Sequence, residues 1–216
     1  MRILVLNPNS SQAITRVLSR VADDWAAASG NDVVTEYLPD APELLVTQAD
    51  NELVAGQIWQ RIARLADDGF DAMVIACHGD PGLPDGWAVQ DRRPVVGMGW
   101  ASMQLAAAGE GWGVLCVTEE IVADKVEQAA GYGLTGDLIV ARGALRRDYE
   151  TGSNAALGCL VAEVTEIAAA GAASVVLGCG AMSGLAGAVR ERVPAAVIEP
   201  LAAALDQSVL LACATG

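Results

Sequence analysis

A chain of 216 residues can bury a large core and can form either one domain or two smaller ones. Its hydrophobic content of 53% and charged content of 19% are those of a folded protein and exclude intrinsic disorder. The net charge of −14 argues against binding to nucleic acid or to an anionic membrane, because both partners require a basic face.

Short apolar runs alternate with amphipathic stretches in the first half of the chain. Continuous apolar runs bounded by Gly, Pro or Asn predict strands buried on both faces, and a period of 3.6 residues predicts helices. We expect strands at residues 3–6, 33–38, 72–76 and 94–97, a first helix that ends near residue 28, and a second over 51–67. Ser10 or Ser11 can cap the first helix, and residues 39–47 form a loop long enough to lie over a site.

The second half repeats this plan. We expect strands at residues 113–117, 138–141, 175–178 and 195–198, and helices over 121–130, 154–170, 185–192 and 201–214. Gly171 provides the stop signal of the long Ala-rich helix before it.

The alternation of strands and helices predicts an α/β fold with parallel sheets built from βαβ units. Because the two halves follow one plan, we expect two similar Rossmann-like domains with pseudo-twofold symmetry. The expected boundary lies near residue 93, with residues 1–93 and about 199–216 in the first domain and 94–198 in the second. In this arrangement the final helix packs back on the first domain.

Both halves contain an apolar run that ends in a cysteine and is followed by small, turn-forming residues. Residues 73–83 place Cys77 after one run, and residues 174–185 place Cys179 after the other. Each thiol then lies at the carboxyl end of a strand, where open α/β sheets bind ligands. Backbone N–H groups of Gly-rich turns favour an anion, so either thiol could act as a thiolate base. Our hypothesis is that the two thiols face each other across a cleft between the domains.

The other cysteines are expected to have no role in chemistry. The first apolar run is too short for the core of a signal peptide, and no later apolar run is long enough to span a membrane. We therefore expect a cytoplasmic protein, in which the cysteines are reduced thiols. Cys116 in a strand and Cys159 in a helix should be buried packing residues. Cys213 should be an incidental thiol near the end of the chain.

Polar residues follow the first strand of each half. Asn7-Pro8-Asn9-Ser10 stands at one of these positions and Thr118-Glu119 at the other. Each set alone is typical of a turn or helix cap, but as a pair at the same rim they could hold the polar group of a substrate. His78, the one histidine, could tune the Cys77 thiolate or only point into the domain wall, and the sequence leaves both interpretations open.

We expect neither a metal nor a cofactor. A zinc site made of Cys77, His78 and Cys179 would lack the usual ligand spacing. The glycine fingerprints of phosphate loops and dinucleotide-binding folds are absent from the sequence.

These motifs together resemble hydantoin and allantoin racemases of the cofactor-independent aspartate/glutamate/hydantoin racemase superfamily. The resemblance rests on Leu6-Asn7-Pro8-Asn9-Ser10-Ser11, Ala76-Cys77-x-Gly79-Asp80-Pro81-Gly82-Leu83, Pro94-Val95-Val96-Gly97, Val117-Thr118 and Leu177-Gly178-Cys179-x-x-Met182. It implies two α/β domains with the active site between them. One cysteine would remove a proton from a carbon next to a carbonyl, and the other would return a proton on the opposite face.

Carried over to this sequence, the resemblance makes Cys77 and Cys179 the acid/base residues. The residues expected to bind the small-molecule substrate are Asn9, Ser10, His78, Thr118, Glu119 and Gly180. Glu119 stands where a second threonine is common in the family, and its charge would disfavour a carboxylate substrate and suit a neutral ring. A homo-oligomer is expected.

The sequence therefore predicts a racemase or epimerase that acts on a 5-substituted hydantoin or a related amino-acid derivative. Two other activities of the same superfamily remain as alternatives: cis–trans isomerisation of the maleate type and decarboxylation of the arylmalonate type. A further alternative is a non-catalytic protein of the same fold, which binds a ligand or uses its thiols for redox chemistry.

Overall fold

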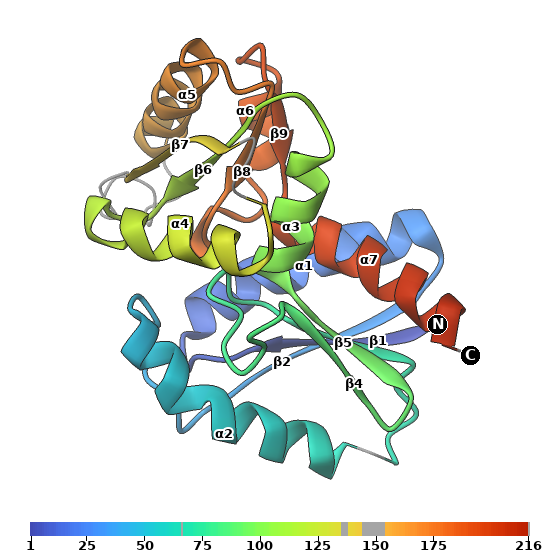
Figure 1. Cartoon of the computed structure of the whole chain (residues 1–216). Coiled ribbons are helices and arrows are strands. Elements are labelled where there is room, and N and C mark those ends of the chain that lie inside the picture. The colour runs from blue at the N-terminus through green and yellow to red at the C-terminus, as the bar shows by residue number, and fades with distance from the viewer. Residues whose placement is uncertain (66, 135–137, 144–153, 216) are drawn as a thin grey trace. The chain divides into compact units, whose positions relative to one another are not determined.

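The computed structural model describes residues 1–65, 67–134, 138–143 and 154–215. The chain folds into two compact units (Figure 1). The first comprises Met1–Ala101 and Leu201–Gly216, and the second comprises Ser102–Pro200. Each unit holds one sheet with helices packed against it.

The first unit is built on a five-stranded sheet with the order β2-β1-β3-β5-β4. Its strands are β1 (Arg2–Asn7), β2 (Asp32–Tyr37), β3 (Ala72–Ile75), β4 (Trp87–Gln90) and β5 (Arg93–Gly97). All neighbours are parallel except β4, which runs antiparallel to β5 at one edge. The central strands β1 and β3 are almost entirely buried, because helices cover both faces of the sheet.

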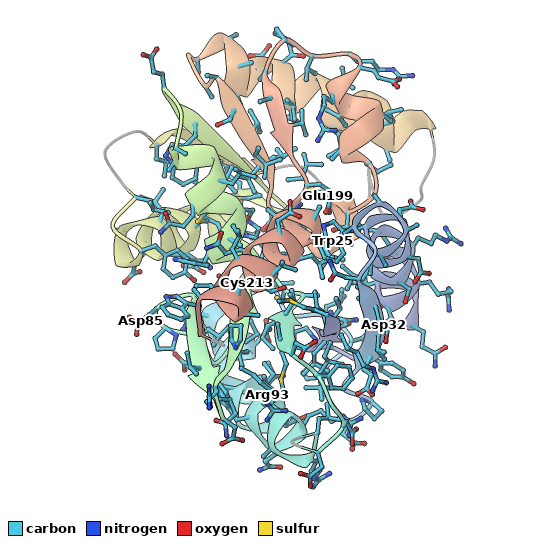
Figure 2. All side chains as sticks on the ribbon, turned by 90° about the vertical axis from the view of Figure 1, so that its right-hand side faces the viewer. Trp25, Asp32, Asp85, Arg93, Glu199 and Cys213 are labelled. Carbon is cyan, nitrogen blue, oxygen red and sulfur yellow. The ribbon has the colours of Figure 1, made fainter. Side chains whose placement is uncertain are left out.

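Helices α1 (Gln12–Ser29) and α7 (Pro200–Thr215) cover one face of this sheet, and α2 (Gln48–Arg64) covers the other (Figure 1). Successive side chains of β1 point to opposite faces. Ile3 and Val5 accordingly join the core under α1 and α7, while Leu4 and Leu6 join the core over α2. The indole N–H of Trp25 on α1, labelled in Figure 2, donates to Asp206 of α7 at 2.8 Å, and this bond joins the two helices.

The second unit holds a parallel sheet with the order β7-β6-β8-β9. Its strands are β6 (Trp112–Cys116), β7 (Leu138–Gly143), β8 (Ser174–Leu177) and β9 (Ala196–Ile198). The helices α4 (Val122–Gly131), α5 (Asn154–Ala169) and α6 (Ala186–Arg190) pack on it, and 3-10 turns η1 (Glu119–Ile121) and η3 (Gly180–Met182) follow β6 and β8. Helix α3 (Met98–Ala107) spans the boundary between the units.

The parallel strands of the two sheets follow the same plan. Counted in chain order within each unit, they are arranged second, first, third, fourth in both sheets. This confirms the predicted α/β fold with parallel sheets, since every crossover in both units carries a helix or a long connection. The pseudo-twofold relation between the units stays a prediction.

Three features differ from what the sequence led us to expect. Strand β4 and helix α3 were not predicted, because β4 is an edge strand with alternating exposure and α3 begins among glycines. Strand β5 lies in the first sheet, although the expected boundary near residue 93 assigned residues 94–97 to the second domain. The reason is that Val95 pairs with Met73 of β3, so the chain leaves the first unit only within α3.

Gly178, between β8 and Cys179, has no room for a side chain. Its N–H donates to the carbonyl of Leu115 at 2.9 Å, and a Cβ would lie 2.8 Å from that carbonyl oxygen and 2.9 Å from Cγ1 of Val114. We predict that Gly178→Ala lowers the free energy of unfolding by about 1–3 kcal/mol through overpacking, as measured by urea denaturation. Gly158→Ala is the control, because a Cβ on this exposed face of α5 meets nothing within 4 Å. The control should leave stability unchanged or raise it by up to about 1 kcal/mol, and equal losses in both variants would contradict the prediction.

Candidate active site

In each sheet, the chain adds its second strand on one side of the first and its third strand on the other. This makes β1 and β3 neighbours, with Leu6 opposite Ile75, and makes β6 and β8 neighbours, with Leu115 opposite Leu177. The carboxyl ends of such a pair form the switch point at which open α/β sheets bind ligands. Both predicted cysteine motifs and both predicted polar turns follow these four strands.

The turn after β1 is held by side-chain hydrogen bonds. Nδ2 of Asn7 donates to Oδ1 of Asn9 at 3.0 Å and to the Thr15 hydroxyl at 2.9 Å. Oδ1 of Asn9 also accepts the backbone N–H of Ser11 at 2.9 Å, which fixes the orientation of the carboxamide. Ser11, one of the two predicted caps, accepts the N–H of Ile14 and begins α1. Among the described residues, Nδ2 of Asn9 has no hydrogen-bond partner, so this donor is available to a ligand.

Ser10 joins this turn to the loop that the sequence predicted over residues 39–47. Its backbone N–H donates to the carbonyl of Pro42 at 3.1 Å, so the loop lies against the turn. The Ser10 side chain remains partly exposed, whereas Asn7 and Asn9 are buried.

Cys77 stands at the carboxyl end of β3, as the sequence predicted. The N–H of Ala76 donates to the carbonyl of Leu6 at 2.9 Å, which extends the pairing with β1 to the residue before the cysteine. The Cys77 carbonyl then accepts the N–H of Asp80 at 3.0 Å and closes a turn. The thiol residue is partly exposed, and His78 inside the turn is buried.

Cys179 occupies the corresponding position after β8. Its backbone is extended, and the residue caps the 3-10 turn η3 that begins at Gly180. The Sγ atom accepts the backbone N–H of Ala181 at 3.4 Å. This contact fixes the position of the sulfur atom at the start of the turn.

Two buried hydroxyls accompany Cys179 in the second unit. Thr118 follows β6 at the N-cap position of η1 but makes no capping bond, and Ser183 follows η3. Within the part of the chain that the structure describes, neither Oγ1 of Thr118 nor Oγ of Ser183 has a hydrogen-bond partner. Glu119, the next residue after Thr118, is exposed.

The predicted site residues thus gather at two sheet edges. Asn9, Ser10, Cys77 and His78 lie on turns at the carboxyl edge of the first sheet, and Thr118, Glu119, Cys179 and Gly180 lie on turns at that of the second. That these two half-sites form one active site stays a prediction.

The described residues contain no group of three His, Cys, Asp or Glu side chains placed to hold a metal ion. No described helix is long and apolar enough to cross a membrane.

Sequence reasoning missed Asp80 and Ser183 as members of the two half-sites. Both stand in Gly-rich stretches that are typical of ordinary turns, but both are buried. A signal for Asp80 existed, because α3 begins among Gly97, Met98 and Gly99, none of which offers a side-chain cap.

Comparison with known proteins relates these half-sites to a family. The sequence matches the Asp/Glu/hydantoin racemase family over residues 3–208. A hydantoin racemase of Paenarthrobacter aurescens is 30% identical over 210 residues, which cover 94% of this chain and 88% of that protein. The chain belongs to the Asp/Glu/hydantoin racemase family. It is therefore an isomerase of the racemase type.

Solved structures agree with the fold of this racemase. An allantoin racemase from Klebsiella pneumoniae superposes with a TM-score of 0.89 at 24% identity, covering 100% of this chain and 90% of that chain. An allantoin racemase from Pseudomonas fluorescens gives a TM-score of 0.85 at 25% identity, with 100% and 94% covered. A glutamate racemase from Thermus thermophilus shares the fold more distantly, with a TM-score of 0.66 at 18% identity, covering 99% and 80% of the two chains.

The three remaining cysteines of the racemase lie in different environments. Cys116 is fully buried in β6, and burial raises the pKa of its thiol to about 12, with Lys125 opposing this shift. Cys159 on α5 is partly exposed, where we expected burial, because the helix turns this position away from the centre of the core. Cys213 is exposed on α7 (Figure 2).

The raised pKa of Cys116 predicts an inert thiol. At pH 8 a thiol with a pKa of about 12 is thiolate in roughly one molecule in 10⁴, and the thiolate is the nucleophile. We expect iodoacetamide to modify Cys213 and to leave Cys116 unmodified in the folded protein, as read by mass spectrometry of the peptides. Modification of Cys116 at the rate of Cys213 would contradict this.

The same shift links the stability of the fold to alkaline pH. The folded pKa of about 12 lies above the ordinary value of 9.0, so the neutral thiol stabilises the fold fully below pH 9, and this contribution is lost as pH rises toward 12. Cys116→Ala should therefore lose less unfolding free energy between pH 8 and pH 10.5 than the wild type, as measured by urea denaturation at each pH. Cys213→Ala should follow the wild-type curve, and identical curves for all three proteins would refute the linkage.

Proposed function

We propose that this racemase inverts a carbon next to a carbonyl in a 5-substituted hydantoin or a related amino-acid derivative, with Cys77 and Cys179 as its two acid/base residues. The observation that carries the proposal is the equivalent placement of the two thiols. Each follows the third parallel strand of its sheet, next to the end of the first strand. The choice of substrate class is supported by the curated relatives named hydantoin racemase.

Inversion explains why two groups are needed. One thiolate takes the proton from the substrate carbon, and the C–H electron pair moves into the neighbouring carbonyl to give an enolate. The opposite thiol then delivers its own proton to the other face of that carbon. The first cysteine ends as a thiol and the second as a thiolate, so the enzyme is ready for the enantiomer of its first substrate, and no oxidant or reductant is consumed.

The polar turns offer groups for the substrate oxygens. Nδ2 of Asn9 is a donor for a carbonyl oxygen, and its charge-stabilising effect grows as the enolate forms. The hydroxyls of Thr118 and Ser183 are buried groups whose hydrogen bonding a ligand would complete. In this proposal Ser10 and Gly180 line the two turns, and His78, which is buried next to Cys77 in the chain, forms part of the first turn.

The test uses single substitutions and isotope exchange. We expect Cys77→Ala and Cys179→Ala each to lower racemisation of an enantiopure 5-substituted hydantoin by about 10²–10⁴-fold, because each removes one acid/base group. In deuterated water each variant should still exchange the substrate α-proton from one enantiomer, and the two variants should do so for opposite enantiomers. Chiral chromatography and mass spectrometry measure the two quantities separately.

Cys159→Ala and Cys213→Ala are the matched controls and should keep wild-type racemisation. Full activity in both Cys77→Ala and Cys179→Ala would sink the two-thiol mechanism. Absence of turnover with every hydantoin, beside turnover of free amino acids, maleate or an arylmalonate, would instead sink the proposed substrate class.

Glu119 gives a second test of the substrate class. The residue is exposed at the start of η1, one position after Thr118, and its charge repels a substrate carboxylate. We expect Glu119→Gln to lower the KM for a carboxylate-bearing analogue such as an N-carbamoyl amino acid, and to leave the KM for a neutral hydantoin within about twofold, since an exposed charge acts weakly. Glu120→Gln is the control. An equal effect of both substitutions would mean that Glu119 has no special relation to the substrate.

A further inference from the structure

We propose that Asp80 is a positioning residue of the first half-site, and that its carboxylate holds the Cys77 turn against the first N–H groups of α3. The inference rests on the proposed acid/base role of Cys77. We call this arrangement the Asp80 clamp.

The clamp consists of two short hydrogen bonds. Oδ1 of Asp80 accepts the backbone N–H of Gly99 at 2.7 Å, and Oδ2 accepts that of Trp100 at 2.6 Å. Asp80 is only 3% exposed. Both N–H groups belong to the first turn of α3, where the helix dipole favours a negative charge. Ionised acceptors at such distances form bonds roughly twice as strong as neutral ones.

The backbone of Asp80 is bound into the Cys77 turn at the same time. Its N–H donates to the Cys77 carbonyl at 3.0 Å, and its own carbonyl accepts the N–H of Leu83 at 3.0 Å. Every hydrogen-bonding group of the residue is therefore engaged, and the residue links the thiol turn to the helix. A shift of the carboxylate must be transmitted to Cys77, which lies only three residues earlier in the chain.

The surroundings of the carboxylate are shaped to receive it. Gly97 at the end of β5 has no room for a Cβ, which would collide with the Asp80 carboxyl group and lie 2.7 Å from the carbonyl oxygen of Gly86. Gly97 also donates its N–H to that Gly86 carbonyl at 2.8 Å. Glycine at position 97 lets the end of β5 approach the Asp80 turn closely enough for the carboxylate to reach α3.

Asp80 holds a backbone conformation that is costly for a residue other than glycine. Its φ is +46°, in the left-handed region, which Asp tolerates better than most residues. An ordinary helix cap would come from the residue just before α3 and would need no such conformation. Strain of this kind persists where the surrounding structure enforces it, and it is concentrated at functional sites.

The clamp also bears on the substrate class. The N–H groups at the start of a helix commonly bind anions, but here Gly99 and Trp100 already donate to an internal carboxylate. A substrate carboxylate cannot use these donors in the wild-type protein. This favours a neutral ring over a free amino acid at the first half-site and deepens the proposed function.

The first experiment measures α-proton exchange in Asp80→Asn. The carboxamide keeps the shape and tolerates the left-handed backbone, but its NH2 group faces an N–H that had donated to an oxygen. We expect exchange from the enantiomer that depends on Cys77 to fall about 100-fold, the cost of a misplaced reacting group. Exchange from the enantiomer that depends on Cys179 should stay within about twofold. The Cys77→Ala and Cys179→Ala proteins identify which enantiomer is which.

The chain provides a matched control in Asp91. It also has a left-handed backbone, with a φ of +49°, but it is exposed in the turn between β4 and β5. Asp91→Asn should leave both exchange rates unchanged. A general loss of folding would lower both rates equally, so the asymmetry between enantiomers separates positioning from stability.

The second experiment is chemical rescue. Asp80→Gly relieves the backbone strain and vacates the carboxylate position. Sodium formate should fill that position and raise the Cys77-dependent exchange rate of this variant at least about tenfold above its rate without formate, because it restores an anion at a helix N-terminus. Sodium chloride at equal ionic strength should not raise the exchange rate of Asp80→Gly. Formate should not raise that of Asp80→Asn, because the carboxamide fills the space.

Wild-type exchange in Asp80→Asn, equal loss from both enantiomers, or no rescue of a folded Asp80→Gly by formate would each overturn the clamp. Failure of the proposed function gives a different result, because the single cysteine variants would then show no opposite dependence on the enantiomers. Thermal denaturation of each variant establishes folding before the rates are compared.

Discussion

The close approach of backbones at the carboxyl edges of the sheets is the constraint on which both half-sites depend. At Gly178 the chain passes within van der Waals contact of the Leu115 carbonyl, immediately before Cys179. At Gly97 the end of β5 lies against the Asp80 carboxyl group, within the turn that follows Cys77. A side chain at either position would push a thiol-bearing turn away from its neighbouring strand, because parallel strands are held at a fixed spacing by their hydrogen bonds.

The two units use this constraint in different ways. In the second unit the thiol is supported locally, since Cys179 caps its own 3-10 turn and accepts the N–H of Ala181. In the first unit the support comes from far along the chain, since the Cys77 turn is anchored through Asp80 to N–H groups of α3. Equivalent strand order therefore does not require equivalent polar contacts. The position of each thiol is set by topology, and its electrostatic environment is set by the loops.

Much of this fold could be predicted from the sequence because its central strands are buried on both faces. Such strands appear as continuous apolar runs, and β1, β3, β6 and β8 all do. The turn residues after these runs then placed Cys77 and Cys179 at strand ends without further information. Two elements escaped the prediction for different reasons. Strand β4 is a short, half-exposed edge strand that pairs with β5 across a tight turn, and it lacks the continuous apolar run of a buried strand. Helix α3 begins where Asp80, 19 residues before Gly99, accepts its N–H groups, and the sequence beside α3 shows only that no ordinary side-chain cap is present.

The asymmetry between the two half-sites has a thermodynamic limit. The two enantiomers of a chiral substrate have equal free energies, so the equilibrium constant of racemisation is one. The ratio kcat/KM must then be the same in both directions, however differently the two thiols are supported. A change that weakens one half-site slows both directions of net racemisation equally. Which half-site has been weakened can be measured only through events that do not complete the inversion. In these events one thiol removes a proton and returns one to the same face of the carbon. The local support of Cys179 and the distant support of Cys77 are therefore distinguishable by exchange with solvent, even though net turnover cannot tell them apart.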